Sequence, residues 1–355
     1  MKTRFFPGYT IGPDSYKEIE RICKPYGTKA AVIGGERAIK AAENKIKEAT
    51  EGSDIRITGF FPYGGEASVE NIERLKSISE IQEADIIFAV GGGKAVDTAK
   101  VVAQTTERPF FTFPTIASTC AACTSLGILY HPDGSLREYS FSDIPPVHIF
   151  IDSEIIANAP SKYLWAGIGD SMAKYFETSV SSRGDELSHS QAMGVYIGNM
   201  CSGPFVKYGE KALMDCENNI VSDELEEIIL GIIVSTGMVS NLVSIDITSG
   251  LAHAVYNGFT VIHQIEEHGH LHGEIVSYGI LVLLIVDKQK EEFKRIYEFN
   301  KKLGLPTRLS DLHCTESHVD RIVEKALSGI DVRHYPYVIT PDMVKDAIAF
   351  LESRN

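Results

Sequence analysis

The chain has 355 residues, of which 44% are hydrophobic and 23% are charged, so it carries enough apolar material for two globular cores. Its net charge of −14 offers no cationic footprint, and we therefore expect neither a nucleic acid nor a membrane as partner. The N-terminal residues lack a signal-peptide run, and the most apolar stretch, YGILVLLIVD, is too short to span a membrane. Six irregularly spaced cysteines argue against a disulfide framework, so a cytoplasmic protein is expected.

Through about residue 150, short apolar runs typical of strands alternate with amphipathic stretches typical of helices. The strand-like runs are KAAVIGG, DIRITGF, DIIFAVGGG, PFFTFPT and VHIFID, with helix-like segments such as SVENIERLKSISEI and GKAVDTAKVVAQTT between them. Strands flanked by helices predict a parallel, doubly wound α/β sheet. The segment GILYHPDGSLREYSF interrupts this rhythm and predicts a hairpin that turns at Asp133-Gly134.

Beyond Pro160 the pattern becomes helical, and β-branched runs become rare. We therefore predict an α/β, Rossmann-like domain over residues 1–158 and an all-α domain over residues 159–355. No long linker separates them, so the boundary is expected to be tight. The cleft between such domains is the natural place for a ligand.

The segment DIIFAVGGGKAVDTAK predicts a phosphate-binding turn. Gly91–Gly93 end a buried strand, and the following helix is expected to start near Ala95. Glycines let backbone N–H groups approach a phosphate, although a tight turn also uses them for geometry alone. Lys94 would touch the phosphate or stay solvated. Asp97 would complement the helix dipole or contact the ligand directly.

A second glycine pair, Gly34-Gly35, follows the earlier strand KAAVI. In dinucleotide-binding folds the residues after this strand meet the adenosine ribose. Here they give a mixed signal, since Glu36 suits the free 2′-hydroxyl of NAD and Arg37 suits the 2′-phosphate of NADP. The balance favours NAD, and NADP is not excluded.

Histidines concentrate late in the chain. Five of the 11 histidines fall within twenty residues, at positions 253, 263, 268, 270 and 272. Asp170, in the segment GIGDSMAKYFE, adds a carboxylate. One carboxylate with two imidazoles makes an open catalytic site for Zn²⁺ or Fe²⁺. The alternatives are an Asp170 that only caps a helix and a helix connection that is histidine-rich by chance.

Cys120 and Cys123 have the spacing of a redox dithiol or of half a zinc ribbon. No second pair with this spacing exists, which excludes a structural Cys₄ zinc site. A thioredoxin-like dithiol stays open as an alternative. The preferred interpretation is that both thiols are small, weakly polar residues lining a pocket.

The chain resembles the iron-containing alcohol dehydrogenase superfamily, and most closely its glycerol dehydrogenase branch. The resemblance covers the whole length and is specific in VGGGKAVDTAK, FPTIASTCAACTS, GIGDSMAKYFE, and LAHAVYNGFT with HGEIVSYG. It implies the dehydroquinate synthase-like fold, a nicotinamide cofactor, one divalent metal with zinc preferred over iron, and a homo-oligomer. The family is expected to place cofactor and metal in the cleft.

The resemblance also implies roles for particular residues. It assigns both metal binding and catalysis to Asp170, His253 and His272, with His270 or His268 as substitutes for His272. It assigns cofactor contacts to Gly93, Lys94, Thr115, Ser118, Thr124, Leu126 and Tyr130. The glycine-rich segment adds Gly92 and Asp97 to the expected cofactor-binding residues.

The substrate is expected to be a small alcohol such as glycerol, and one departure from the family pattern bears on it. Cys120 stands where glycerol dehydrogenases carry an Asp that binds the polyol. The TCAA version, with RHYPYVITPDMVKDAI, is similar to hydroxycarboxylate dehydrogenases, which makes a 2-oxo acid the alternative substrate. Two further alternatives are a dehydroquinate-synthase-like lyase and a nucleotide-binding protein without catalysis.

Overall fold

The computed structural model describes residues 3–354, and their contacts define two compact units. One unit runs up to Ser161 and also includes Asp215–Ile229. The other comprises Lys162–Met214 and the chain from Leu230 onward. Compactness by itself does not define a folding unit, so the domain boundary after residue 158 stays a prediction.

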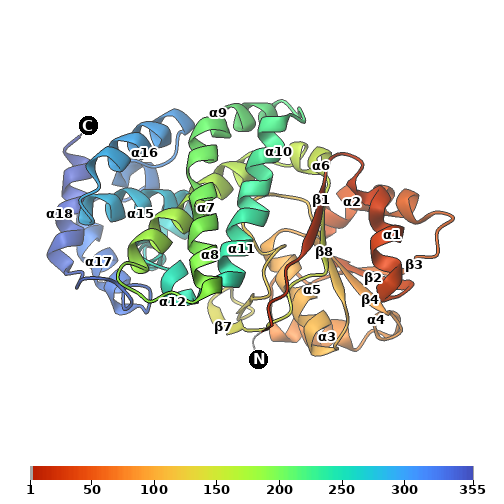
Figure 1. Ribbon diagram of the computed structural model, residues 1–355. Coiled ribbons are helices and arrows are strands. Elements are labelled where there is room, and N and C mark those ends of the chain that lie inside the picture. Colours follow the sequence, from red (N-terminus) through yellow and green to blue (C-terminus); the bar gives the residue numbers. More distant parts are fainter. Residues whose placement is uncertain (1–2, 355) are drawn as a thin grey trace. The chain divides into compact units, whose positions relative to one another are not determined.

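The first unit is built on a parallel sheet that has six strands within residues 3–354, in the order β1-β8-β5-β4-β2-β3 (Figure 1). The five strands predicted from the sequence are confirmed. The additional strand, β1, pairs with β8 at one edge, and its four half-exposed residues carry too little apolar pattern to be recognised. The strands are β1 (Gly8–Ile11), β2 (Lys29–Gly34), β3 (Arg56–Pro62), β4 (Ile86–Gly91), β5 (Phe110–Pro114) and β8 (His148–Ile151).

Alternate residues of the central strands enter two separate cores, as the two-residue period of a strand requires. In β2, Ala30 and Val32 pack on one face, and Ala31 and Ile33 pack on the other. Helices α1 and α2 cover the first face, and α3, α4 and α5 cover the second. These helices are α1 (Ile19–Cys23), α2 (Glu36–Thr50), α3 (Val69–Lys76), α4 (Ser79–Gln82) and α5 (Gly93–Thr105).

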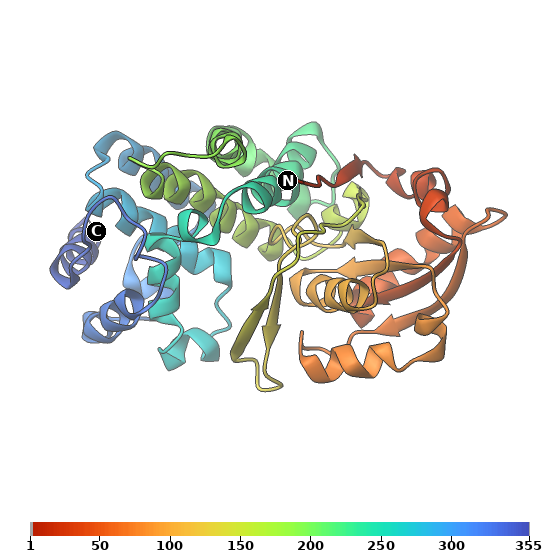
Figure 2. The same cartoon turned by 60° about the horizontal axis from the view of Figure 1, so that its bottom comes forward.

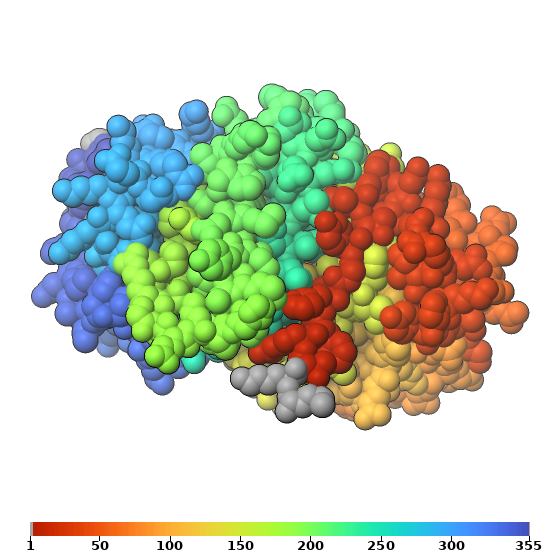
Figure 3. All heavy atoms as spheres, in the orientation of Figure 1, coloured from red at the N-terminus to blue at the C-terminus, as the bar shows by residue number. Residues whose placement is uncertain are grey.

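The predicted hairpin is confirmed as β6 (Gly127–Tyr130) paired antiparallel with β7 (Leu136–Ser140). Its turn includes Gly134, whose φ of +85° is a left-handed conformation that favours glycine. Figure 2 shows the hairpin in olive, standing apart from the parallel sheet. The N-terminal segment lies at the surface (Figure 3), where the Tyr9 side chain is 48% exposed.

The second unit is helical, as predicted. Its helices are α7 (Lys162–Ser181), α8 (His189–Gly198), α11 (Thr236–Leu242), α12 (Ile245–Thr248), α13 (Leu251–Phe259), α14 (His263–Glu267), α15 (His272–Val286), α16 (Lys290–Leu303), α17 (Val319–Ser328) and α18 (Pro341–Glu352). Helix α6 (Ser153–Ala157) belongs to the first unit, as does α10 (Asp223–Leu230) up to Ile229, and α9 (Gly203–Glu217) runs from the second unit into the first. Single-turn helices are η1 (Ser15–Glu18), η2 (Lys24–Tyr26), η3 (Asn199–Cys201), η5 (Leu309–Leu312) and η6 (Glu316–His318), and η4 (Gly231–Ser235) is a π-helical turn.

The apolar stretch YGILVLLIVD lies in α15, which is buried along almost its entire length and acts as a core helix. Another helical run, Asp223–Leu242, is long and apolar enough to cross a membrane by composition, which the sequence analysis did not identify. Of its 18-residue apolar window, 61% is buried inside the protein, which fits a helix of the core.

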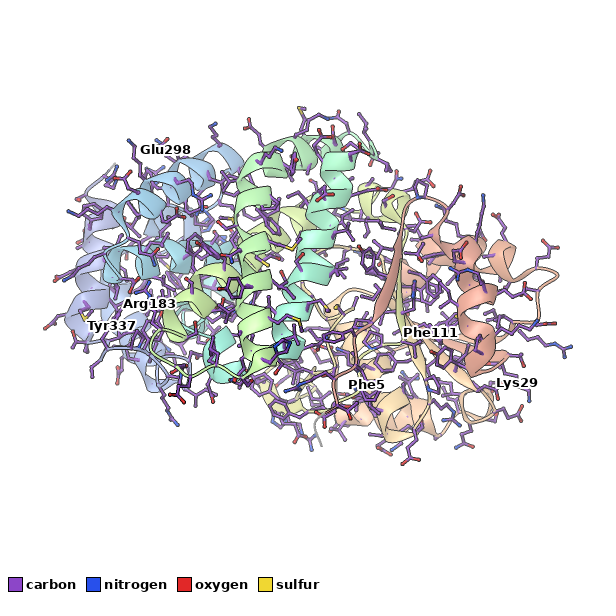
Figure 4. The ribbon with its side chains drawn as sticks, viewed as in Figure 1. Phe5, Lys29, Phe111, Arg183, Glu298 and Tyr337 are labelled. Atoms are coloured by element: carbon purple, nitrogen blue, oxygen red, sulfur yellow. The ribbon has the colours of Figure 1, made fainter. Side chains whose placement is uncertain are left out.

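The segment before α18 is held by polar side chains. Arg183 donates to both carboxylate oxygens of Asp287, at 2.8 and 2.7 Å, and the Tyr337 hydroxyl donates to the same carboxylate at 2.8 Å. Figure 4 shows the labelled Arg183 and Tyr337 next to one another. Asp331 accepts from Ser249, just before α13, and from Asn257, near the end of α13, so this segment also supports that helix.

Candidate functional site

Three helices of the second unit bring one carboxylate and two imidazoles together. Asp170 lies in α7, His253 in α13, and His272 is the first residue of α15. The Nε2 atoms of His272 and His253 lie 3.2 and 3.5 Å from Asp170 Oδ1, and one ligand atom from each residue falls within 4.8 Å of the others. Helix α7 begins at Lys162, so the interpretation of Asp170 as a helix cap is wrong.

Small residues beside each of these side chains allow the helices to approach so closely. A Cβ on Gly273 would lie 1.9 Å from the Ala166 carbonyl oxygen, and a Cβ on Gly169 would lie 2.4 Å from the Gly273 oxygen. Helices α7 and α15 therefore cross in backbone contact next to Asp170 and His272. A Cβ on Gly279 would likewise lie 2.4 Å from the oxygen of Ala252, the residue before His253.

Glu177 fixes the orientation of His253. Its fully buried carboxylate accepts from His253 Nδ1 at 2.7 Å, and the backbone N–H groups of His253 and Gly250 donate to it at 2.9 and 3.0 Å. With Nδ1 engaged by Glu177, Nε2 of His253 faces Asp170 and is the nitrogen placed to bind a cation. The sequence analysis missed Glu177; its place two helical turns after Asp170, on the same face of α7, is the signal that could have identified it.

The electrostatics of this group match a cation. Burial alone would raise the pKa of Asp170, but His272 and His253 hold it well below its ordinary value. Burial alone would lower the pKa of His253, but Glu177 and Asp170 raise it to about 10. Two buried carboxylates around two imidazoles thus leave an excess of negative charge, which fits a divalent metal ion.

His268 and His270 lie outside this group. His270 Nδ1 contacts Glu274 Oε1 at 2.8 Å, and its Nε2 lies 2.8 Å from His313 Nδ1. The His268 ring stacks on His313, with ring centroids 3.7 Å apart. The structure therefore places His272, and neither of these two histidines, beside Asp170 and His253.

In the first unit, a pocket opens where β4 meets α5. Gly91, with φ of +141°, turns the chain, Gly92 caps the helix, and α5 begins at Gly93, two residues before the predicted start. The first N–H groups of a helix have no partner within it, so they are available to a phosphate. The pocket is lined by Gly91, Gly92, Gly93, Val96, Pro114, Ile116, Ser118, Thr119, Ala121 and Ala122.

Lys94, Thr115 and Tyr130 border this region in different ways. Lys94 forms an ion pair with Glu66 at 2.6 Å and lies 5.2 Å above the ring of Tyr130. The backbone N–H of Thr115 donates to the Gly91 carbonyl at 3.3 Å, which joins the ends of β4 and β5.

Asp97, Thr124 and Leu126 gather around a buried lysine. Lys100 Nζ contacts Asp97 at 2.8 Å, Thr124 Oγ1 at 3.3 Å and the Leu126 carbonyl at 2.6 Å. Asp97 also accepts from the backbone of Ile128 at 3.3 Å. These contacts tie α5 to the hairpin and engage the Asp97 carboxylate in a buried ion pair with Lys100.

Cys120 is partly exposed and Cys123 is buried, in a turn closed by a 2.9 Å hydrogen bond from the Cys123 N–H to the Cys120 carbonyl. Burial raises the pKa of the Cys123 thiol far above its ordinary value. A reactive dithiol needs a lowered pKa, so this favours the interpretation of Cys123 as a packing residue. The intervening Ala121 and Ala122 line the glycine-rich pocket.

A doubly wound sheet with a glycine-rich pocket and a helical unit with an Asp-His-His group are the two parts that a metal-dependent dehydrogenase needs. Residues 7–153 match the family model described as iron-containing alcohol dehydrogenase. Glycerol dehydrogenase of Thermotoga maritima is 32% identical, covering 94% of this chain and 92% of that protein. Hydroxycarboxylate dehydrogenase A of Escherichia coli K12 is 32% identical over 92% and 90%, respectively.

Among solved structures, glycerol dehydrogenase from Schizosaccharomyces pombe superposes with a TM-score of 0.86 at 28% identity, covering 99% of this chain and 91% of that one. The chain belongs to the iron-containing alcohol dehydrogenase family. It is therefore an alcohol dehydrogenase, a metal-dependent oxidoreductase that works with a nicotinamide cofactor, and the predicted fold class is confirmed.

Proposed function

We propose that this protein interconverts a small polyol of the glycerol type and its carbonyl compound, with NAD as the cofactor and Zn²⁺ as the metal. The observation that carries the proposal is the group formed by Asp170, His253 and His272. Three protein ligands with positions left over are the arrangement of catalytic zinc sites. Similarity to glycerol dehydrogenases along nearly the whole chain supports the polyol as substrate.

In this proposal Asp170, His253 and His272 hold the metal, which when bound supplies a Lewis acid for the substrate oxygen. Asp170 contributes its charge, because its lowered pKa keeps it ionised across the physiological range. Glu177 keeps the proton of His253 on Nδ1, so that Nε2 stays available as a ligand atom.

The glycine-rich pocket is the proposed binding site of the cofactor pyrophosphate. Gly92 and Gly93 leave room for the phosphate oxygens, and the start of α5 offers unpaired N–H groups and partial positive charge. Ser118 adds a hydroxyl to the same pocket. Lys94 follows Gly93 directly and forms an ion pair with Glu66. Its positive charge would attract the pyrophosphate of the bound cofactor.

The substrate side of the proposal is tested by a steady-state assay of the zinc-loaded protein with glycerol and NAD, and with 2-oxo acids and NADH or NADPH. Glycerol oxidation is the expected result. Turnover of 2-oxo acids alone would identify the protein as a hydroxycarboxylate dehydrogenase instead. The thiol of Cys120, in place of a carboxylate, favours this alternative. A protein that binds NADH without net consumption would instead support the lyase or the nucleotide-binding alternative.

The remaining properties are part of the same proposal. We expect a cytoplasmic homo-oligomer whose partners are its small-molecule substrate and cofactor, without nucleic acid or membrane. The net charge of −14 supports the absence of polyanionic partners. Sedimentation analysis of the purified protein would measure the oligomeric state directly.

A further inference from the structure

A second cluster of metal-binding side chains lies beside the group already described and shares no residue with it. It consists of His268, His270, His313 and Glu274, and we call it the His270 cluster. His268 and His270 flank Gly269 in the connection between α14 and α15, and His313 ends the η5 turn, more than forty residues later. None of these side chains belongs to the group of Asp170, His253 and His272.

The His270 ring is held as a metal-bound imidazole is usually held. Its Nδ1 contacts Glu274 Oε1 at 2.8 Å, and the other oxygen of that carboxylate accepts from the Leu271 N–H at 2.9 Å. A carboxylate behind one ring nitrogen places the proton there and leaves the lone pair on the other. The His270 side chain is only 6% exposed, so this orientation is fixed by packing.

The lone pair of His270 Nε2 points at a second imidazole. Nδ1 of His313 lies 2.8 Å away, and the ring of His268 stacks on His313 with an angle of 14° between the planes. His268 and His313 are exposed. Zn–N bonds of about 2.0–2.1 Å hold two ligand nitrogens roughly 3.3 Å apart, so a small outward movement of the exposed His313 would admit an ion.

We propose that the His270 cluster binds a second divalent transition-metal ion of the kind that imidazoles prefer, with Zn²⁺ as the probe. His270 Nε2 and His313 Nδ1 are the first two ligands, and the exposed His268 supplies a third by rotation of its side chain. Imidazole nitrogen suits Zn²⁺, Ni²⁺ and Cu²⁺ and disfavours Mg²⁺ and Ca²⁺. Solvent access at His268 and His313 provides the entry path.

An ion at this place would join two distant parts of the second unit. The connection that carries His268 and His270 runs directly into α15, whose first residue is His272. Binding to His313 would tie this connection to the turn that follows η5. The ion therefore acts as a structural clamp on the backbone that leads to His272.

Metal stoichiometry tests the proposal. The metal-free protein is dialysed against buffered Zn²⁺, and bound zinc per chain is measured by mass spectrometry. We expect two equivalents in the wild type, one in Asp170→Asn, one in His313→Ala and none in the double variant. His263→Ala is the matched control, because His263 is 80% exposed in the same segment, and it is expected to retain two.

Two equivalents in His313→Ala would overturn the proposal, because the second ion would then bind elsewhere, such as at Cys120 and Cys123. One equivalent in the wild type and none in Asp170→Asn would also overturn it, while leaving the proposed function intact. One equivalent in the wild type that Asp170→Asn retains and His313→Ala loses would support the His270 cluster and contradict the proposed zinc at Asp170.

A second measurement guards against misfolding of His313→Ala. Hydrogen exchange of the amides of residues 268–271 is expected to slow on addition of Zn²⁺ in the wild type and in Asp170→Asn. The milder variant His313→Gln, which keeps a polar side chain, is expected to lose this zinc-dependent protection. Equal protection in His313→Gln and in the wild type would overturn the clamp.

Discussion

Glu177 shows how a single buried carboxylate can orient a histidine that the proposed function assigns to the metal. It accepts two backbone N–H groups and the ring N–H of His253, so its own position and that of the ring are set together. In the Glu177→Gln variant the amide loses the negative charge and one acceptor atom. We expect zinc affinity and kcat each to fall by about 10–100-fold, measured by chelator competition and steady-state kinetics.

The control for Glu177→Gln is Ser179→Ala on the same helix, since the Ser179 hydroxyl only donates to the Phe176 carbonyl. It should leave both zinc affinity and kcat unchanged. A Glu177→Gln variant with normal zinc affinity would show that the carboxylate serves the fold alone.

Replacing Lys100 is expected to have a large effect on the stability of the fold. Its side chain is completely buried and is paired with buried Asp97. Removing one partner of a buried ion pair leaves an uncompensated charge, and this typically costs about 3–5 kcal/mol. Lys100→Met should therefore lower the free energy of unfolding by an amount of this order, measured by denaturant titration.

The double variant Asp97→Asn/Lys100→Met provides the comparison for Lys100→Met. The amide keeps an acceptor for the Ile128 N–H, and no buried charge remains. It should recover a large part of the lost stability. If both variants are equally unstable, the loss comes from packing, because charge then makes no difference.

At the scale of elements, the crossing of α7 and α15 decides whether Asp170 and His272 meet. Gly273→Ala would place a Cβ 1.9 Å from a backbone oxygen of α7, which has no flexible end that can move aside. The helices must separate, at a cost of about 1–3 kcal/mol. We expect a lower melting temperature together with at least tenfold weaker zinc binding.

Gly203→Ala in α9 is the matched control, because nothing lies within 4 Å of the added Cβ. An alanine in a helix stabilises by up to about 1 kcal/mol relative to glycine where space allows. This variant should therefore be as stable as the wild type or more stable. Normal zinc binding in Gly273→Ala would contradict the importance of the helix crossing.

The edge strand β1 adds a dependence on pH through His148 of β8. Burial, with Arg21 nearby, lowers the pKa of His148 to about 4, and its ring contacts Thr10 Oγ1 at 2.9 Å. Between pH 6.5 and 4 the unfolded chain binds more protons at this histidine than the folded chain. Stability should therefore fall on acidification through this range, by an amount on the order of 2 kcal/mol, reduced by partial exposure.

His148→Gln removes the titrating group and keeps a donor for Thr10. Its melting temperature should change less than that of the wild type between pH 6.5 and 4, while the two curves run parallel above pH 6.5. Identical pH profiles for the two proteins would show that His148 does not titrate differently in the folded and unfolded states.

At the scale of the whole molecule, the glycine-rich pocket and the Asp-His-His group belong to different compact units. Their functions should therefore separate. Asp170→Asn is expected to lose zinc at this group and catalytic turnover and to bind NAD with unchanged affinity. Gly93→Asp is expected to keep the zinc and weaken NAD binding at least tenfold, because its carboxylate would repel the pyrophosphate.

Calorimetric titration with NAD and measurement of zinc content would check both variants. An aspartate at the start of α5 also complements the helix dipole, so Gly93→Asp should remain folded. Loss of both ligands in either variant would show that the two sites depend on one another.

Much of this protein could be read from its sequence because the relevant signals are local. Strands β2, β4 and β5 are continuous apolar runs, and Gly91–Gly93 follow one of them directly. Asp170, His253 and His272 were selected by motifs and by their residue types. The short edge strand β1 escaped, because its four residues acquire meaning only by pairing with β8.

The tertiary structure alone decided which side chains meet. His313 carries no local signal, because its partner His270 lies more than forty residues away. The spacing of Glu177 from Asp170 indicates a shared face of α7, but only the tertiary structure brings Glu177 to His253. Glu274 meets His270 through the course of the turn before α15. By residue type and local sequence Asp170 suits a helix cap as well as a ligand, and only the start of α7 eight residues earlier excludes the cap. Likewise, the close glycine contacts of α7 and α13 with α15 bring His272 next to Asp170, and His268 and His270 stay outside the group. The sequence determines the residue types and the period with which they recur. The crossings of helices determine the distances between residues that lie far apart in the chain.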